Sequence, residues 1–497
     1  MYGIESEKTF INELTAEPTL CGTEYFATLL QIKGRRSVVG ATVLYDGGIP
    51  VGVKSDWGVE GLDGSFHLGE SSTIPVSDKD GGLTELSRRA LVELNECQEA
   101  IGAVGGAVLN MSNNPLIART QENVDRYSIP RPHSYAREVR GWDHSATIDA
   151  STQNSPSTSV SSFEAADAMN VILGLGSAFV ALYANSPFYQ GSVSGVQETR
   201  LRMWKQYFGS STVPGDKYLF SAPPRPFRTL REYFTWIYDA PRSLYFVTDS
   251  PKPGTTEVPV VIDEEPSVMA FARSEAMAGK TYPDNQSIIV RPKLHHIERN
   301  QFMQFYGARL RFAFTDGGVP PSEFLSAMEG KSTEVEQFMD DMTDCMYIEG
   351  RDPGTNFADA MFADTAPEAA ASMYISPSAL QAGLIANTTG SRKILDQFDW
   401  DTLVGLREEA IRSGMEAEYK GAKVKHLVEL ALEAAAEGIG VDNHWMLEYP
   451  LHVLRTGVNG AARALTKYEG TREATTAARI RTVLLASKAI PGASLLR

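Results

Sequence analysis

The ten residues that open the sequence constrain the fold and the chemistry of this chain together. They read Met1-Tyr2-Gly3-Ile4-Glu5-Ser6-Glu7-Lys8-Thr9-Phe10. As a β-strand, this stretch places Glu5 and Glu7 on one face and Ile4 and Ser6 on the other. The two carboxylates are then roughly 7 Å apart. Like charges held together inside a fold are costly unless a cation lies between them. Oxygen ligands of this kind suit Mg²⁺ or Mn²⁺. The alternative is an edge strand with a solvated acidic face.

Composition limits the classes of partner. The 497 residues are 42% hydrophobic and 22% charged, which is ordinary for a globular protein, and have a net charge of −16. That charge argues against a nucleic-acid partner and against an anionic membrane surface. No apolar run is long enough to predict a transmembrane span. The acidic start does not resemble a signal peptide, and the three cysteines show no metal-binding spacing, so we expect reduced thiols in a cytoplasmic protein.

The pattern along the chain predicts a mixed fold with a helical end. Apolar residues at helical spacing occur near 86–109, 163–184 and 229–238, and extended segments lie among and before them. Beyond Gly390 the chain is nearly all helix, in segments near 392–414, 416–437, 445–468 and 471–489. We therefore expect an α+β catalytic core over 1–391, with a helical portion over 392–497 packed on the same domain.

Familiar nucleotide and metal motifs nearly occur, but each one fails. Gly174-Leu175-Gly176 lacks the third glycine of a dinucleotide-binding loop, because Phe179 stands there. His295-His296 lacks the helical spacing of a zinc-binding pair. Any nucleotide must be bound without the common phosphate loops.

A series of motifs in a fixed order carries a family resemblance. The series comprises Gly3-Ile4-Glu5-Ser6-Glu7-Lys8, Gly81-Gly82-x-x-Glu85-Leu86-Ser87, Ala184-Asn185-Ser186-Pro187-Phe188 with Arg200 and Trp204, Thr229-Leu230-Arg231-Glu232-Tyr233, Tyr245-Phe246-Val247, Tyr347-Ile348-Glu349-Gly350-Arg351 and Ala382-Gly383-Leu384. It resembles the glutamate–cysteine ligase family of the plant and proteobacterial type, whose members are carboxylate–amine ligases. The order is kept from residue 2 to about residue 470.

The resemblance implies a fold, a reaction and a set of site residues. The fold is a curved, mostly antiparallel sheet with an acidic concave face and helices on its other side. The reaction joins the γ-carboxylate of glutamate to the amine of cysteine through an acyl phosphate made from ATP. The partners are thus ATP and amino acids, with Mg²⁺ or Mn²⁺ as the cofactor. The residues implied are Glu5, Glu7, Glu85 and Glu349 as metal ligands, Arg200 and Arg351 as catalytic residues, and Gln153, Asn185 and Arg200 as substrate contacts.

Some of these positions have a structural alternative. Glu85 also suits a helix N-terminus, and Arg200 also suits a helix surface beside Trp204. Gln153 precedes Pro156, and a proline favours an edge strand or a bend over a central strand. The region 272–346 is longer than the family pattern. Two alternatives therefore stay open: the same chemistry on another carboxylate and amine, or a ligase-like protein that binds nucleotide or metabolite without turnover.

Overall fold

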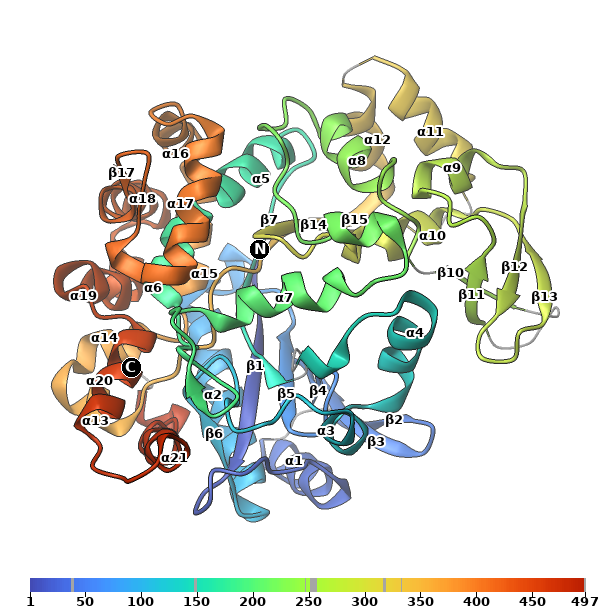
Figure 1. Cartoon of the computed structure of the whole chain (residues 1–497). Coiled ribbons are helices and arrows are strands. Elements are labelled where there is room, and N and C mark those ends of the chain that lie inside the picture. Colours follow the sequence, from blue (N-terminus) through green and yellow to red (C-terminus); the bar gives the residue numbers. More distant parts are fainter. Residues whose placement is uncertain are drawn as a thin grey trace.

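The structure is a computed structural model that describes residues 1–36, 40–146, 150–245, 247–250, 257–315, 319–331 and 333–495. Phe246, one of the motif residues, lies outside this set. A large curved sheet forms the centre of the molecule, with its strands in the order β14-β15-β7-β1-β5-β4-β3-β2 and β6 paired to β1 (Figure 1). Within the described residues every strand pairing in this sheet is antiparallel. Its strands are β1 (Tyr2–Asn12), β2 (Thr42–Asp46), β3 (Ile49–Ser55), β4 (Gly58–Leu62), β5 (Leu68–Thr73), β6 (Gly106–Leu109), β7 (Asn154–Ser159), β14 (Ala308–Phe314) and β15 (Thr343–Gly350).

Strand β1 is the predicted N-terminal strand, and it lies inside the sheet. It pairs with β5, β6 and β7, and Glu7 lies directly opposite Glu70 of β5. Because side chains alternate along a strand, Glu5 and Glu7 share one face while Ile4, Ser6 and Lys8 share the other. The solvated edge strand is therefore excluded, since a strand with partners on both sides has no free edge.

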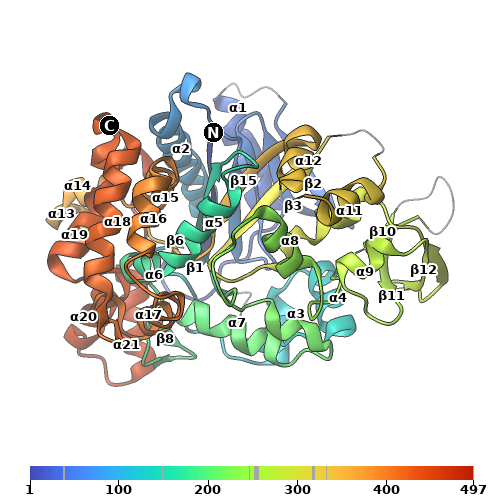
Figure 2. The same cartoon turned by 90° about the horizontal axis from the view of Figure 1, so that it is seen from above.

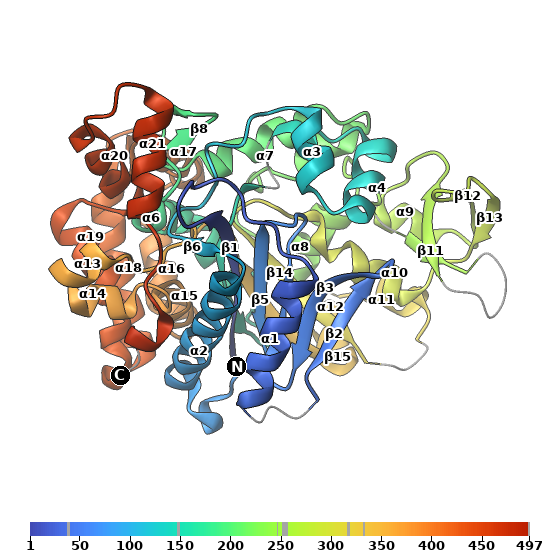
Figure 3. The ribbon, with the colours of Figure 1, turned by 90° about the horizontal axis from the view of Figure 1, so that it is seen from below.

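Helices cover the face of the sheet that carries Ile4, Ser6 and Lys8. Figure 3 shows α1 (Thr23–Arg35) and α2 (Gly82–Ala103) lying across β1, β5 and β3. Helix α2 begins after Gly81, whose φ of 98° is readily adopted only by glycine. Its residues Leu83, Leu86, Ala90 and Leu94 recur at helical spacing and are buried against the sheet. The opposite face is left for the candidate site.

Pro156 corrects one expectation. It lies in β7, which is an interior strand between β15 and β1, and not in an edge strand. Strand β15 pairs with β7 only at Ser157, Thr158 and Ser159. Pro156 is tolerated because no hydrogen bond from its backbone nitrogen to β15 is required. The Gln381 side chain donates to the Pro156 carbonyl at 3.0 Å and to the Ile348 carbonyl at 3.1 Å. A side chain thus connects the two strands where their pairing stops.

The C-terminal part is helical, as expected, and packs on one side of the sheet (Figure 1). Helices α15 and α18 approach so closely that a Cβ built on Gly383 would lie 2.3 Å from the Ala435 carbonyl oxygen. The helices of this part are α13 (Ala360–Thr365), α14 (Pro367–Ser372), α15 (Ser376–Ala386), α16 (Thr388–Leu395), α17 (Trp400–Ser413), α18 (Val424–Ile439), α19 (Glu448–Thr456), α20 (Gly460–Gly470) and α21 (Thr476–Ala486).

A separate small sheet lies at the periphery, opposite the C-terminal helices (Figure 2), and only its last two strands belong to the longer region 272–346. Its strands are β10 (Val247–Asp249), β11 (Val258–Ile262), β12 (Met277–Thr281) and β13 (Ser287–Val290). The remaining longer helices are α3 (Gln121–Tyr127), α4 (Pro130–Arg140), α5 (Ala165–Gly174), α6 (Gly176–Tyr183), α7 (Thr199–Gly209), α8 (Leu230–Tyr238), α9 (Val268–Arg273), α10 (Leu294–Arg299), α11 (Pro321–Glu329) and α12 (Glu334–Met342). No single helix in the described ranges is long and apolar enough to cross a membrane, and α5 with α6 reaches that length only across a bend of 48°.

Candidate active site

Two adjoining cavities open on the face of the sheet that carries Glu5 and Glu7. The first cavity encloses about 760 Å³, counting the solvent at its mouth. It is lined by Glu5, Glu7, Asp63, Gly64, Ser151, Gln153, Arg200, Trp204, Tyr207, Phe305, Arg309 and Arg351. Carboxylates from β1 and the β4–β5 connection thus face arginines from α7, β14 and the end of β15.

The second cavity lies beside the first and encloses about 980 Å³, again with its open mouth. Hydroxyl groups, aromatic rings and two arginines dominate its walls, which are formed by Met1, Tyr2, Gly3, Ile4, Glu5, Glu70, Ser72, Thr73, Pro75, Ser157, Ser159, Phe302, Arg309, Arg311, Cys345 and Tyr347. Glu5 and Arg309 line both cavities. These two side chains therefore form a wall common to both.

The carboxylates at this wall repel one another. Burial raises the pKa of Glu5, Glu7 and Glu70 above the usual value, and the charges of neighbouring carboxylates raise these pKa values further. For Glu70 those neighbours are Glu5, Asp63 and Glu7. The Ser72 hydroxyl donates to the Glu70 carboxylate at 3.1 Å. Among the described residues no cation is in direct contact with Glu70, so negative charge is concentrated here.

Glu349 has the opposite environment. Arg309 and Arg351 each approach its Oε1 at 2.8 Å, and Arg311 approaches its Oε2 at 2.9 Å. Although burial alone would raise the pKa of Glu349, these three guanidinium groups lower it to about 2. Both oxygens of Glu349 already accept hydrogen bonds from arginines, so a metal ion would have to share them.

The donor set at the wall fits a hard divalent cation in chemistry, although the side chains do not converge on one point. No group of three or more His, Cys, Asp or Glu side chains in the described part of the chain is close enough to hold a metal ion. The raised pKa values of Glu5, Glu7 and Glu70 are the property that a nearby cation would reverse. Carboxylate oxygens are also the ligands that Mg²⁺ prefers.

Arg200 fixes the geometry of the first cavity. It is 2% exposed, and its Nε donates to Glu198 at 2.8 Å. Its two terminal nitrogens donate to the Gln153 side chain at 3.0 Å and to the backbone carbonyls of Arg351 and Asp352 at 3.2 and 2.8 Å. Four of the five guanidinium N–H groups therefore have protein partners, which leaves one for a bound molecule.

Arg351 has more donors to offer than Arg200. Its terminal nitrogen donates to Glu349 at 2.8 Å, while its buried Nε has no hydrogen-bond partner among the described residues. The guanidinium lies 5.4 Å from the ring centroid of Phe305 and 5.9 Å from that of Trp204. A cation beside two aromatic rings, with an unused donor in the cavity wall, is suited to bind a carboxylate or a phosphate.

Gln153, which the resemblance implies as a substrate contact, lies in the first cavity. Its backbone N–H donates to the Glu7 carboxylate at 2.8 Å, and its carbonyl accepts from the Glu7 N–H at 2.9 Å. Because its side-chain oxygen also accepts from Arg200, Gln153 connects the carboxylate side of the cavity to the arginine side.

Glu85 is a correction. The structure places it in the first turn of α2, on the helix-covered side of the sheet, and it lines neither cavity. It forms ion pairs with Arg88 at 2.7 Å and Arg89 at 2.8 Å. Hydrogen bonds from these two residues lower the pKa of Glu85 to about 2. The helix-terminus alternative is the right one, because Leu83 and Leu86 turn the apolar side of the helix toward the sheet and leave Glu85 pointing outward.

Asn185 is a second correction. It is buried, and its amide nitrogen donates to the Asn110 side chain at 3.1 Å and to the Thr355 carbonyl at 2.9 Å. Its backbone N–H donates to Glu198 at 2.8 Å. Asn185 lines neither cavity. It supports the Glu198 carboxylate, which in turn orients Arg200.

Sequence reasoning missed four charged residues of the site: Asp63, Glu70, Arg309 and Arg311. In the sequence Asp63 precedes Gly64 and Ser65, a pattern that indicates a turn. Arg309 and Arg311 are two residues apart, as are Glu349 and Arg351. In the structure Arg309 is the direct partner of Glu349 across β14 and β15. This alternation of charge on two extended segments is the signal that would have revealed the arginines.

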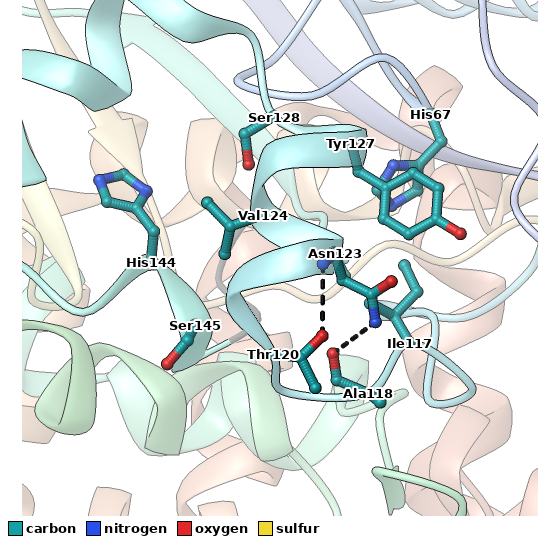
Figure 4. Close-up of a pocket in the computed structure, with 11 residues that line it drawn as sticks. His67, Ile117, Ala118, Thr120, Asn123, Val124, Tyr127, Ser128, His144 and Ser145 are labelled. Carbon is teal, nitrogen blue, oxygen red and sulfur yellow. Dashed lines mark hydrogen bonds between the residues drawn. The ribbon is translucent and has the colours of Figure 1, made fainter.

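A third cavity of about 270 Å³ lies near helix α3 (Figure 4). Its walls include His67 and His144, with Ile117, Val124 and Tyr127 beside them. None of the described residues that line it carries a carboxylate or a guanidinium group. Its chemistry is thus unlike that of the other two cavities.

The antiparallel sheet and its two adjoining cavities can be set beside known proteins. Residues 75–240 match the sequence model of glutamate–cysteine ligase family 2. The resemblance to this family is thereby confirmed, over a stretch that contains Gln153, Arg200 and Trp204. No curated protein matches the chain.

Two solved structures are similar at low identity. The glutamate–cysteine ligase of Francisella tularensis in complex with AMP is 11% identical with a TM-score of 0.45, and the match covers 100% of this chain and 88% of that one. The bifunctional glutathione synthetase of Pasteurella multocida is 12% identical with a TM-score of 0.39, and the match covers 100% of this chain and 51% of that one. The chain therefore spans about half the length of the second protein.

Proposed function

We propose that this protein is an ATP- and Mg²⁺-dependent carboxylate–amine ligase. It forms a γ-glutamyl amide, with glutamate and cysteine as the leading substrate pair, and so supplies glutathione biosynthesis. The observation that carries the proposal is the wall formed by Glu5 and Arg309, which separates two polar cavities lined by charges of both signs. A reaction between a triphosphate and an amino-acid carboxylate needs two such sites that meet at one point. The family match over 75–240 supports the same class of enzyme.

The two cavities suit different substrates. The second cavity offers Phe302 and Tyr347 to a base, and Arg309 and Arg311 to phosphate oxygens. The first cavity offers Arg351 and the remaining N–H of Arg200 to the carboxylates of the acceptor amino acid. The γ-phosphate of ATP and the acceptor carboxylate then meet beside Glu5 and Arg309.

The proposed reaction has two steps. An oxygen of the acceptor carboxylate attacks the γ-phosphorus, the bond to ADP breaks, and an acyl phosphate forms. The nitrogen of the amine then attacks the acyl carbon, phosphate leaves, and the nitrogen loses a proton. Arginines 309, 311 and 351 stabilise the negative charge that develops on the transferred phosphoryl group.

Divalent ions are part of the proposal. Mg²⁺ at Glu5, Glu7 and Glu70 would neutralise carboxylates that otherwise repel a triphosphate. The register of β1 and β5 puts Glu7 opposite Glu70. Arg200, Arg309 and Arg351 line the same cavity as Glu7.

Incubation with ATP, Mg²⁺, glutamate and a panel of amines tests the function. We expect ADP and phosphate to be released in equal amounts only with a productive amine, and cysteine to be the best one. Mass spectrometry of the product identifies the amide. Release with a different carboxylate and amine would support the alternative substrate pair. Tight ATP binding without release for any pair would contradict the enzyme and support the non-catalytic alternative.

A further inference from the structure

A lysine is buried directly behind the carboxylates of the site. Lys8 of β1 is 0% exposed, and its side chain is on the helix-covered face of the sheet. Its ammonium group donates to the Ser6 carbonyl oxygen at 3.1 Å and to the Ser71 hydroxyl at 2.7 Å. A fully buried ammonium group is costly, and the buried Glu93, whose pKa the charge of Lys8 lowers, supplies part of the compensating charge.

The two acceptors of Lys8 belong to the two strands that present the acidic residues. Ser6 lies between Glu5 and Glu7 on β1, and Ser71 follows Glu70 on β5. Ser6 and Ser71 are directly opposite each other in the β1–β5 register. The ammonium group therefore ties β1 to β5 at the point where the carboxylates project from the other face.

Lys8 has a matched counterpart in the same buried layer. Lys33 of α1 is 1% exposed, and its ammonium group pairs with Glu60 at 2.8 Å and Glu96 at 3.1 Å. Unlike Lys8, Lys33 makes no hydrogen bond to β1 or β5 within the part of the chain that the structure describes. The two lysines share burial and charge, but only one holds the strands that carry the site.

We propose that Lys8 is a positioning residue that sets the separation of Glu5 and Glu7 from Glu70 for a divalent cation. This inference rests on the proposed function. Lys8 touches no substrate and no reacting atom, because it acts through the backbone of β1 and the Ser71 hydroxyl. Outer partners that orient metal ligands contribute about 10- to 100-fold in metal affinity.

Mn²⁺ binding tests the proposal without any turnover. The free Mn²⁺ signal in electron paramagnetic resonance is measured while the full chain is titrated with the metal alone. We expect Lys8→Met to weaken Mn²⁺ binding about tenfold, the lower end of that range. Lys33→Met, although it also loses stability, should bind Mn²⁺ within about twofold of wild type. Thermal unfolding of both variants separates loss of fold from loss of binding.

Two serine variants, which remove a single hydroxyl each, test the same proposal if either lysine variant fails to fold. Ser71→Ala removes one acceptor of Lys8, and we expect about threefold weaker Mn²⁺ binding. Ser55→Ala on β3 serves as the control, because it removes a buried hydroxyl that donates to the Gly58 carbonyl at 3.4 Å, accepts from the Trp57 N–H at 3.3 Å and does not contact Lys8. Wild-type Mn²⁺ affinity in Lys8→Met or in Ser71→Ala overturns the positioning role alone. A wild-type protein that binds no Mn²⁺ overturns the metal site and this inference with it.

Discussion

Arg309 binds both carboxylate oxygens of Glu349, with Nε at 2.9 Å from Oε2 and its terminal nitrogen at 2.8 Å from Oε1. The two residues are direct partners across β14 and β15, and both are almost fully buried. The pair holds one arginine in the wall common to both cavities. The contribution of this ion pair to stability and to activity can be measured.

Replacing Glu349 with glutamine should cost both stability and activity. Three arginines would lose their shared anion, and a broken buried ion pair costs about 3 kcal/mol. We expect kcat to fall by more than about 100-fold, because displaced arginines no longer meet the transferred phosphoryl group. Urea unfolding and steady-state kinetics measure the two effects. Asp216→Asn is the control, since the buried Arg140–Asp216 pair lies outside both cavities. Equal loss of activity in both variants would contradict a specific role for Glu349.

Glu70 should make stability depend on pH. Burial and the charges of Glu5, Asp63 and Glu7 raise its pKa well above 4.5 in the folded protein. The folded state therefore holds this proton more tightly than the unfolded chain, and the associated stability is lost as pH rises through the raised pKa. Glu70→Gln should be more stable than wild type at pH 8, by on the order of 1 kcal/mol, and no different at pH 4.

Mg²⁺ provides the control for Glu70. The ion should stabilise wild type at pH 8, because a ligand that binds only the folded state raises the free energy of unfolding. It should stabilise Glu70→Gln much less. Equal stabilisation of the two proteins by Mg²⁺ would show that Glu70 is not part of the ion site.

Glu85→Gln should retain wild-type turnover. The residue lies outside both cavities and pairs with the partly exposed Arg88 and Arg89. Exposed pairs of this kind contribute about 1 kcal/mol or less, so only a small drop in the melting temperature is expected. Glu5→Gln, measured beside it, should reduce kcat by more than about 100-fold. A loss of turnover in Glu85→Gln that matches that of Glu5→Gln would restore Glu85 to the metal site.

Arg351→Lys and Arg311→Lys should affect different substrates. Arg351 lines only the first cavity and Arg311 only the second. Lysine keeps the charge but loses the planar, bidentate geometry. We expect Arg351→Lys to raise the KM for the acceptor amino acid, and Arg311→Lys to raise the KM for ATP, each about tenfold or more. Initial-rate kinetics with each substrate varied in turn test this. If Arg351→Lys raised the KM for ATP and Arg311→Lys that for the acceptor amino acid, the proposed contents of the two cavities would have to be exchanged.

Local pattern was enough to predict part of the site. The alternation in β1 correctly put Glu5 and Glu7 on one face, and the motif at Glu349 and Arg351 correctly pointed to the same region. Glu70 was not predictable in this way, because it reaches Glu7 only through the β1–β5 register across 63 residues. Glu85 and Asn185 were misplaced because a motif records residue order and not the direction in which a side chain points. Pro156 misled because its missing N–H matters only where a neighbouring strand would pair with it.

The wall of Glu5 and Arg309 has a thermodynamic consequence. Since one carboxylate and one guanidinium belong to both cavities, a molecule bound in either cavity changes the electrostatic potential that the other molecule meets. Linkage requires this influence to be equal in both directions. The affinity for a nucleotide measured without an amino acid, and that for an amino acid measured without a nucleotide, should therefore each differ from its value in the ternary complex by the same factor.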